Sequence, residues 1–169
     1  LFGIKEDPEE YGTTKSGRRT PHYLDIRPGI TSFFTRNFVA QKMLELTDKR
    51  VVQRGCDHTH EVYTHFSGTP EAMTSYATTM ADLAEFNLLQ PRVDANKTSG
   101  NKTPILGKYK KGDQVAAYDD VVTDGESKIT TVKTLGTAGL TVADYFVVLD
   151  REEGGANEVR AETGIDIIP

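Results

Sequence analysis

The chain is short of cysteine, of long apolar runs and of positive charge, and each shortage excludes a class of protein. Its single thiol, Cys56, cannot form an internal disulfide, which favours a reducing compartment such as the cytoplasm. No apolar run approaches the ~20 residues that a membrane-spanning helix needs, and the start of the chain is too polar for a signal peptide. With 20 lysines and arginines against 25 aspartates and glutamates, the net charge of −5 argues against a general nucleic-acid binder.

What the chain does contain is a regular alternation of helical and strand patterns over 169 residues, a length that suits one domain. Residues 1–29 are polar and rich in turn formers, which predicts an irregular cap with a short extended piece at residues 22–26. Strand patterns occupy residues 62–66, 115–118, 142–149 and 165–168, and helical patterns occupy residues 33–46, 70–86, 127–138 and 156–163. This alternation predicts an α/β fold with a mainly parallel sheet flanked by helices, in which ligands bind at the carboxyl ends of the strands.

Two of these elements carry more specific expectations. In the first helix, the apolar positions that are expected to face the core are Phe34, Phe38, Met43, Leu44 and Leu46. Residues 67–70 are expected to break the strand at 62–66, and Pro70 suits the first turn of the helix that follows.

Residues 94–112 interrupt the alternation with glycine, asparagine, lysine and threonine and with little apolar material. A segment of this length without secondary structure is usually a functional lid or disordered. Because it carries Lys97 and Lys102, we predict a mobile loop that closes over a polyanion.

A possible metal site at residues 56–60 offers Cys56, His58 and His60. Zinc sites need about four ligands at typical spacings, and no matching second cluster is present in the sequence. We therefore interpret these side chains as structural or solvated and predict no metal-ligating residues.

The most informative segment is residues 115–127, in which an apolar strand pattern ends in two adjacent carboxylates, Asp119 and Asp120. A short loop with Thr123 and Ser127 then opens a helix. Backbone N–H groups at a helix N-terminus bind anions, and paired carboxylates suit ribose hydroxyls, from which they accept hydrogen bonds. An ordinary strand–turn–helix with a serine or threonine N-cap explains the same residues about equally well.

Three segments in this order resemble the orotate phosphoribosyltransferases, which belong to the type I phosphoribosyltransferase family. Residues 115–127 resemble the family signature for phosphoribosyl pyrophosphate (PRPP), in which Asp-Asp-Val-Val-Thr is followed by Gly and Ser. Residues 15–27 resemble its N-terminal Lys-Ser-Gly-Arg element, and residues 147–155 resemble its Asp-Arg-x-x-Gly-Gly stretch. The resemblance covers nearly the whole chain and implies the type I fold with a hood at residues 1–29. It also implies a further strand and helix after Pro169.

The same resemblance implies the residues that bind PRPP. Asp119 and Asp120 would hold the ribose 2- and 3-hydroxyls, and the loop up to Ser127 would wrap the 5-phosphate. Gly68 and Thr69 would cradle the pyrophosphate. The full set expected at the ribose and phosphate is Asp119, Asp120, Val121, Val122, Thr123, Asp124, Gly125, Glu126 and Ser127.

For orotate, the resemblance implies that Arg151 holds the carboxylate, as a planar two-pronged donor can. The other residues expected at the base are Lys15, His22 and Tyr23. The residues expected to act in catalysis are Lys97, Arg92, Asp120 and Lys15, with Arg92 and Lys97 at the start of the mobile loop.

Together these matches imply an Mg²⁺-dependent orotate phosphoribosyltransferase of pyrimidine (UMP) biosynthesis, a homodimer whose loop reaches into the neighbouring site. Three residues depart from the family pattern: Val93 and Ser99 stand where lysine and histidine are usual, and Glu126 adds a carboxylate to the phosphate loop. These departures leave two alternatives open. One is a phosphoribosyltransferase for another base, and the other is a PRPP-sensing binding protein without catalysis.

Overall fold

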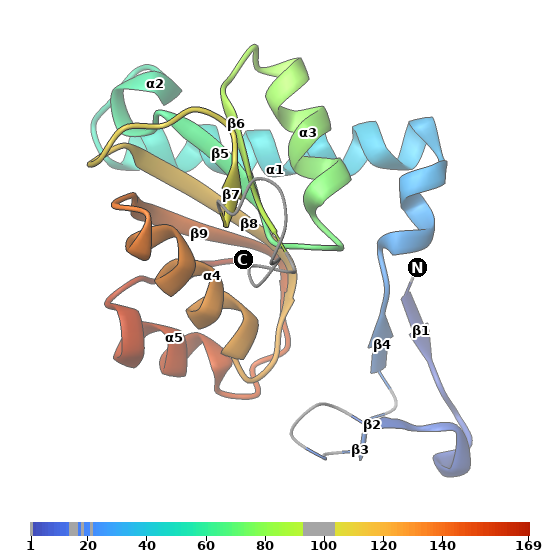
Figure 1. The fold of residues 1–169 in the computed structure, drawn as a ribbon. Coiled ribbons are helices and arrows are strands. Elements are labelled where there is room, and N and C mark those ends of the chain that lie inside the picture. Colours follow the sequence, from blue (N-terminus) through green and yellow to red (C-terminus); the bar gives the residue numbers. More distant parts are fainter. Residues whose placement is uncertain (1, 14–16, 18, 21, 93–103) are drawn as a thin grey trace, which may run out of the picture.

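The computed structural model describes residues 2–13, 17, 19–20, 22–92 and 104–169, and a six-stranded sheet lies at the centre of this described part (Figure 1). The strands run in the order β10-β9-β8-β5-β6-β7 across the sheet. Neighbours are parallel except for β7, which is antiparallel to β6. The strands are β5 (His65–Gly68), β6 (Leu88–Pro91), β7 (Ile105–Leu106), β8 (Gln114–Val122), β9 (Thr141–Asp150) and β10 (Ile167–Ile168). The predicted α/β fold with a mainly parallel sheet is confirmed.

Helices cover both faces of the sheet, with α1 and α3 on one face and α4 and α5 on the other (Figure 1). Side chains alternate along β8, so that Ala116 and Tyr118 pack with α1 and α3 while Val115 and Ala117 pack on the α4 face. The helices are α1 (Phe33–Gln53), α2 (Thr59–Val62), α3 (Thr74–Leu83), α4 (Glu126–Thr137) and α5 (Gly155–Thr163). No helix in the described part of the chain is both long and apolar enough to cross a membrane.

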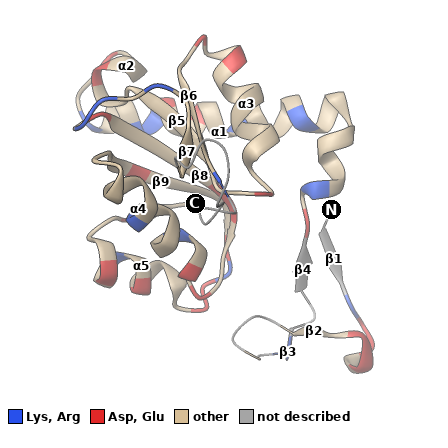
Figure 2. Ribbon diagram, viewed as in Figure 1, with Lys and Arg blue, Asp and Glu red and all other residues tan. Residues whose placement is uncertain are grey.

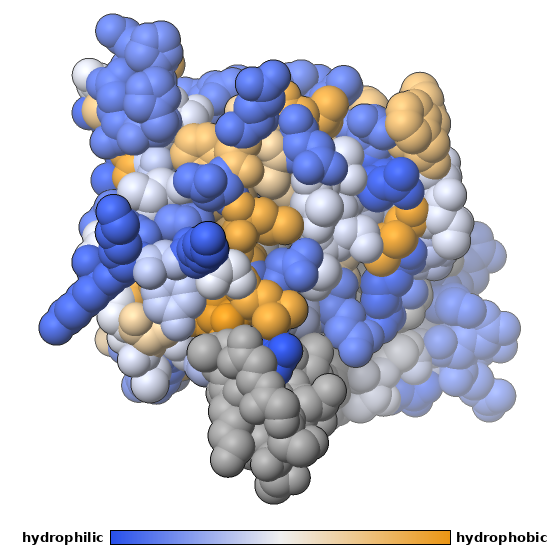
Figure 3. All heavy atoms as spheres, turned by 45° about the horizontal axis from the view of Figure 1, so that its top comes forward, coloured by the Kyte–Doolittle hydropathy of each residue, from blue (hydrophilic) through white to orange (hydrophobic). Residues whose placement is uncertain are grey.

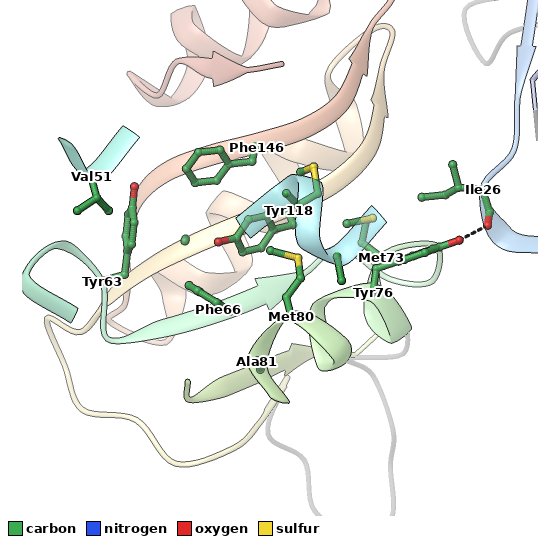
Figure 4. Packing of buried hydrophobic residues seen from close by; sticks show 13 residues of the cluster. Ile26, Val51, Tyr63, Phe66, Met73, Tyr76, Met80, Ala81, Tyr118 and Phe146 are labelled. Atoms are coloured by element: carbon green, nitrogen blue, oxygen red, sulfur yellow. Dashed lines mark hydrogen bonds between the residues drawn. The ribbon is translucent and has the colours of Figure 1, made fainter. Parts of the chain in front are cut away.

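A group of aromatic side chains joins three adjacent strands on the α1–α3 face (Figure 4). Tyr118 of β8 stacks on Phe146 of β9 with ring centroids 5.2 Å apart, and Phe66 of β5 meets Tyr118 edge-on at 5.4 Å. The Tyr118 and Thr47 hydroxyls are 3.0 Å apart, so a hydrogen bond ties α1 to the sheet. Each aromatic pair adds about 0.5–1.5 kcal/mol beyond its area burial, which helps to fix the strands whose ends carry the candidate site.

Helix α1 is longer than predicted, and its buried face differs from the predicted one. That face consists of Ala40, Met43, Thr47 and Val51, with Leu44 and Leu46 partly buried beside it. Phe34 and Phe38 are 78% and 52% exposed, so the prediction that they face the core is wrong. Residues advance about 100° per position, so Phe38, two positions before Ala40, points away from the core, and Phe34 stacks beside it.

Apolar patches interrupt the mostly hydrophilic face of the molecule seen in Figure 3.

The strand predicted at residues 62–66 is β5, which begins only at His65 because Val62 ends the short helix α2. The strand also continues through Gly68, so the predicted break comes later. A Cβ at Gly68 would lie 2.5 Å from the carbonyl oxygen of Met73, and glycine therefore lets the strand end pack against the chain that leads into α3. That helix starts later and ends earlier than predicted.

The segment predicted as a long loop, residues 94–112, is described from residue 104 onward, because residues 93–103 lie outside the described part. Ile105 and Leu106 form β7, which pairs with β6. Ile105 is buried beside Leu89 in the core on the α4 face. The prediction of a loop without secondary structure is wrong for this part, where two apolar residues complete the sheet edge.

The N-terminal region forms two small antiparallel strand pairs and stands beside the sheet in Figure 1. The extended piece predicted at residues 22–26 is confirmed for the three residues of β4, but the strand pairing was not predicted. The elements are β1 (Phe2–Ile4), η1 (Pro8–Glu10), β2 (Gly12–Thr13), β3 (Arg19–Thr20), β4 (His22–Leu24) and η2 (Arg27–Thr31). The Tyr76 hydroxyl of α3 donates to the Ile26 carbonyl oxygen at 2.5 Å, which anchors the region to the domain.

Candidate active site

The order of the strands creates a crevice between β5 and β8. The chain leaves β5 through α3 towards β6 on one side, and it leaves β8 through α4 towards β9 on the other. The two crossovers therefore part between neighbouring parallel strands. Ligands of open α/β sheets bind at the carboxyl ends of the strands at such a switch point. The predicted site is therefore expected at the carboxyl ends of β5 and β8.

Backbone hydrogen bonds hold three of the predicted site segments side by side at this edge. The Thr69 N–H donates to the Tyr118 carbonyl oxygen at 2.8 Å, which joins the predicted pyrophosphate turn to the end of β8. The Arg151 N–H donates to the Val122 carbonyl oxygen at 3.2 Å, which joins the end of β9 to the predicted phosphate loop. The structure thus brings together the segments predicted for pyrophosphate, ribose phosphate and orotate.

A hollow of about 310 Å³ opens at the same edge. It is lined by Thr69, Pro70, Pro91, Arg92, Glu126, Ser127, Thr130, Thr131 and Thr134. Thr69 and Pro70 follow β5, Pro91 ends β6 and Arg92 follows it. The other five residues lie in α4. The volume is at the lower end for small-molecule sites. Three predicted site residues that are far apart in sequence, Thr69, Arg92 and Ser127, therefore line one hollow.

The predicted phosphate loop leads directly into α4. Gly125 adopts a left-handed backbone at the N-cap (φ 82°), and the Asp124 carboxylate accepts a hydrogen bond from the Glu126 N–H at 3.1 Å. The Gly155 N–H donates to the Thr123 carbonyl oxygen at 2.9 Å, so the loop packs on the start of α5. The N–H groups of the first turn of α4 lie at the positive end of the helix dipole and can receive an anion.

The two carboxylates predicted to hold ribose have different surroundings. Asp119 is 4% exposed: its Oδ1 accepts from the Asp120 N–H at 2.8 Å and its Oδ2 lies 2.6 Å from Lys128 Nζ. Burial raises the pKa of Asp119 to about 6, although the Lys128 charge acts in the opposite direction. Asp120 is partly exposed and accepts from the Val121 N–H at 2.7 Å. Asp120 is therefore the more accessible of the two.

Arg151 lies just after the carboxyl end of β9, where the predicted orotate subsite begins. Its Nη2 is 2.8 Å from Glu153 Oε1, and both side chains are about 15% exposed or less. Glu153 therefore orients the guanidinium group. A guanidinium carries its five N–H donors in a planar fork, which is the geometry that binds carboxylates.

The remaining predicted residues are not brought to this edge by the described structure. Lys15 and Lys97 lie outside the described residues. His22 and Tyr23 belong to β4, where they pair with Ile4 and Gly3 of β1 in the two-stranded sheet beside the main sheet (Figure 1). Their roles at orotate and in catalysis stay predictions.

Sequence reasoning missed Lys128, which lies in the first turn of α4 and is 4% exposed. One signal was available: a lysine there is disfavoured by the positive end of the helix dipole, so its presence calls for a partner. That partner is Asp119. The threonines of α4 that line the hollow were also missed, because nothing in the sequence distinguishes them from solvated helix positions.

Comparison with known proteins connects this geometry to a family. No protein-family model matches the chain. It is 34% identical over 140 residues to the orotate phosphoribosyltransferase of Caenorhabditis elegans, covering 83% of this chain and 57% of that protein. It is 30% identical over 154 residues to that of Methanothermobacter thermautotrophicus, covering 91% of this chain and 77% of the relative.

The fold has relatives of known structure as well. The UMP synthase of Leishmania donovani matches with a TM-score of 0.74 and 29% identity, over 93% of this chain and 31% of that protein. The chain thus spans little more than half of the C. elegans relative and a third of the Leishmania protein. The matched relatives, together with the strand-end geometry, show that the chain belongs to the orotate phosphoribosyltransferase family and has the type I phosphoribosyltransferase fold.

Proposed function

We propose that the protein is an orotate phosphoribosyltransferase of UMP biosynthesis. The orotate ring nitrogen would form a bond to the anomeric carbon of PRPP while the bond from that carbon to pyrophosphate breaks, giving orotidine 5-phosphate. The proton of that nitrogen is released to the departing pyrophosphate or to solvent. One observation carries the proposal: the ends of β5, β8 and β9 hold Thr69, Asp120 and Arg151 at one edge of the sheet, beside the switch point. Thr69, Asp120 and Arg151 belong to the segments that the family resemblance assigns to pyrophosphate, ribose and orotate.

In this mechanism the chain positions the reactants and neutralises charge. The N–H groups at the start of α4 and the Ser127 hydroxyl hold the 5-phosphate, and Asp120 accepts a hydrogen bond from a ribose hydroxyl. Such sugar centres react through a cation-like state, so catalysis rests on alignment and on stabilising the leaving group. Arg92 lines the hollow and supplies positive charge to the pyrophosphate.

The proposal includes Mg²⁺ that arrives with PRPP as part of the substrate. In the described part of the chain no three His, Cys, Asp or Glu side chains gather as ligands for a resident metal ion. Four carboxylates nevertheless lie between the end of β8 and the first residue of α4, namely Asp119, Asp120, Asp124 and Glu126. Figure 2 colours acidic residues red, and PRPP is itself a polyanion. A cation carried by the pyrophosphate would reduce this repulsion.

We also propose a cytoplasmic homodimer with shared sites. The single cysteine and the family resemblance support this part of the proposal. Mixing tests the sharing: Lys97→Ala and Asp120→Asn homodimers should each be nearly inactive. A mixed dimer should regain up to about half the activity, because one of its two symmetric sites is intact. If protomers exchange and no activity returns, the sites are not shared in this way.

The test of the function is the loss of orotate ultraviolet absorbance when the protein is mixed with PRPP and Mg²⁺. Steady turnover supports the proposal, with an Asp120→Asn protein as the inactive control. Ser99 favours a second candidate, a PRPP-sensing protein without catalysis, because it stands where the family has a histidine and cannot donate a proton as histidine does. PRPP binding in calorimetry without turnover of orotate or any other base would select that candidate. Turnover with another base would instead reassign the substrate.

A further inference from the structure

We infer that Lys128 is a positioning residue of the PRPP site: it keeps Asp119 ionised and ties this carboxylate to the phosphate loop. The inference rests on the proposed function and goes beyond it, because it assigns a role to a buried residue outside the substrate contacts. Lys128 is not among the residues that line the hollow, whereas the adjacent Ser127 is. Lys128 therefore acts through Asp119.

The geometry accounts for all three N–H donors of the lysine. Its Nζ lies 2.6 Å from Asp119 Oδ2, donates to the Val121 carbonyl oxygen and donates to Ser127 Oγ at 3.2 Å. These partners belong to the carboxylate strand, to the start of the phosphate loop and to the first turn of α4. Lysine is almost never fully buried unless it is paired. One ammonium group therefore holds both ends of the loop that would wrap the 5-phosphate.

The charges around this loop explain why a cation is needed. Asp119, Asp120, Asp124 and Glu126 all lie within eight residues of chain, and the proposed ligand is a polyanion. Lys128 places its charge directly on the most buried of these carboxylates. In a site of low polarity such a charge acts strongly on its neighbours.

The groups that face Asp119 act in opposite directions. Lys128 from α4 and the Asp120 N–H favour the ionised carboxylate, whereas the Asp120 charge and burial disfavour it. Tyr145 of β9 also interacts with the Asp119 charge, but its buried phenol stays neutral, because burial raises its pKa far above the usual value. Its hydroxyl is hydrogen-bonded to Thr69. Among these described neighbours, Lys128 is the cation that keeps Asp119 charged at neutral pH.

The ionisation of Asp119 determines how PRPP affinity should depend on pH. Asp119 has a raised pKa of about 6, so PRPP affinity should fall as the pH drops through about 6. Removing Lys128 removes a stabiliser of the carboxylate, so the pKa of Asp119 rises further. The acid-side loss of affinity should then move to higher pH by about one unit or more.

The first experiment measures PRPP affinity between pH 5.5 and 8.5 for wild type, Lys128→Met and Lys128→Arg. We expect the Met variant to bind about tenfold or more weakly at pH 7 and its acid limb to shift upward. The Arg variant should keep the limb near the wild-type pH because it retains the charge. Lys133→Met is the matched control, since Lys133 is on the same helix but exposed and forms a surface ion pair with Glu162. A folded Met variant with a wild-type acid limb would overturn the inference.

A second measurement needs no substrate and so separates this inference from the proposed function. Carbon NMR of the labelled Asp119 carboxyl should report a midpoint near pH 6 in wild type and a higher one in Lys128→Met. If the Met variant does not fold, Asp119→Asn replaces it, and PRPP binding by that variant should keep only the smaller acid limb that comes from the phosphates of the ligand, whose second pKa is about 6. An acid limb as large as that of the wild type in Asp119→Asn contradicts the inference. Failure of wild type to bind PRPP at any pH would reject the proposed function while leaving the NMR result to decide on the pair.

Discussion

Two buried aspartates on neighbouring strands pair with cations at opposite ends of the sheet. Asp119 lies near the carboxyl end of β8 and pairs with Lys128. Asp144 lies in the first half of β9 and is 2% exposed. Arg50 lies 2.9 Å and Arg54 2.8 Å from its carboxylate oxygens. Burial and ion pairing are thus common to both clusters.

What separates them is their position relative to the strand ends. The Asp144 carboxylate also accepts from the Tyr63 hydroxyl at 2.6 Å, so its partners come from α1, from the residue that follows α1 and from the chain before β5. They join α1 to the sheet at the end away from the hollow. Asp119 instead neighbours the accessible Asp120 and the start of α4. A buried ion pair therefore marks a candidate site only when the fold places it at the crevice.

The largest effect is expected from the pair Asp119→Asn with Asp120→Asn. PRPP binding should be lost, because amides accept fewer hydrogen bonds and carry no charge for Lys128, while the helical circular dichroism should stay close to wild type. Calorimetric titration with PRPP measures the binding. Normal affinity in this double variant would refute the assignment of the strand end to ribose.

Arg151→Ala should impair orotate use by about 2–4 kcal/mol of transition-state binding and leave PRPP affinity nearly unchanged. The lost interaction is a charge-assisted pair with the orotate carboxylate. Steady-state kinetics with each substrate varied in turn separates the two effects. Glu153→Gln serves as the control, since it removes the ion-pair partner of Arg151 but not the guanidinium. Unchanged orotate kinetics in Arg151→Ala would disprove its role.

At Asp144 we expect a loss of unfolding free energy rather than of PRPP binding. Asp144→Asn leaves two guanidinium groups without their carboxylate, and breaking such a pair costs about 3 kcal/mol of unfolding free energy. We use the lower end of the range because Arg50 and Arg54 are 29% and 37% exposed and reach water. Urea unfolding measures the loss, and Glu162→Gln, in an exposed pair, should cost less than about 1 kcal/mol. Equal losses of unfolding free energy in the two variants would show that the buried pair at Asp144 contributes no more than an exposed pair.

The sequence predicts the candidate site better than it predicts the helices around it. Strand ends of a parallel sheet converge, so a contiguous motif such as residues 119–127 needs only the correct fold to be placed. The phase of α1 is set by Ala40 and Thr47, a small and a polar residue, and the larger Phe34 and Phe38 suggested the wrong face. The partner of Lys128 depends on how the loop folds back on β8, which no local pattern encodes.

A smaller effect is expected at the contact between the phosphate loop and the start of α5. A Cβ at Gly155 would lie 2.3 Å from the Thr123 carbonyl oxygen, so Gly155→Ala must push the phosphate loop away from α5. We expect a loss of about 2 kcal/mol in stability together with weaker PRPP binding. Gly136→Ala is the control: nothing lies within 4 Å of its Cβ position in α4, so it should stabilise the protein by up to about 1 kcal/mol. Thermal unfolding that ranks the two variants equally would contradict this contact.

The smallest expected effect has the opposite sign. Glu126 is exposed and is one of the residues that line the hollow, so its charge repels a phosphate at the start of α4. Glu126→Gln keeps the size of the side chain and removes the charge, so PRPP should bind more tightly by less than about 1 kcal/mol, because solvent screens the repulsion. The gain should shrink as salt is added, since exposed charges are screened at high ionic strength. Glu158→Gln, on the exposed side of α5, should change nothing. Weaker binding by Glu126→Gln would mean that this carboxylate contacts the ligand complex favourably, for instance through the Mg²⁺ that accompanies PRPP.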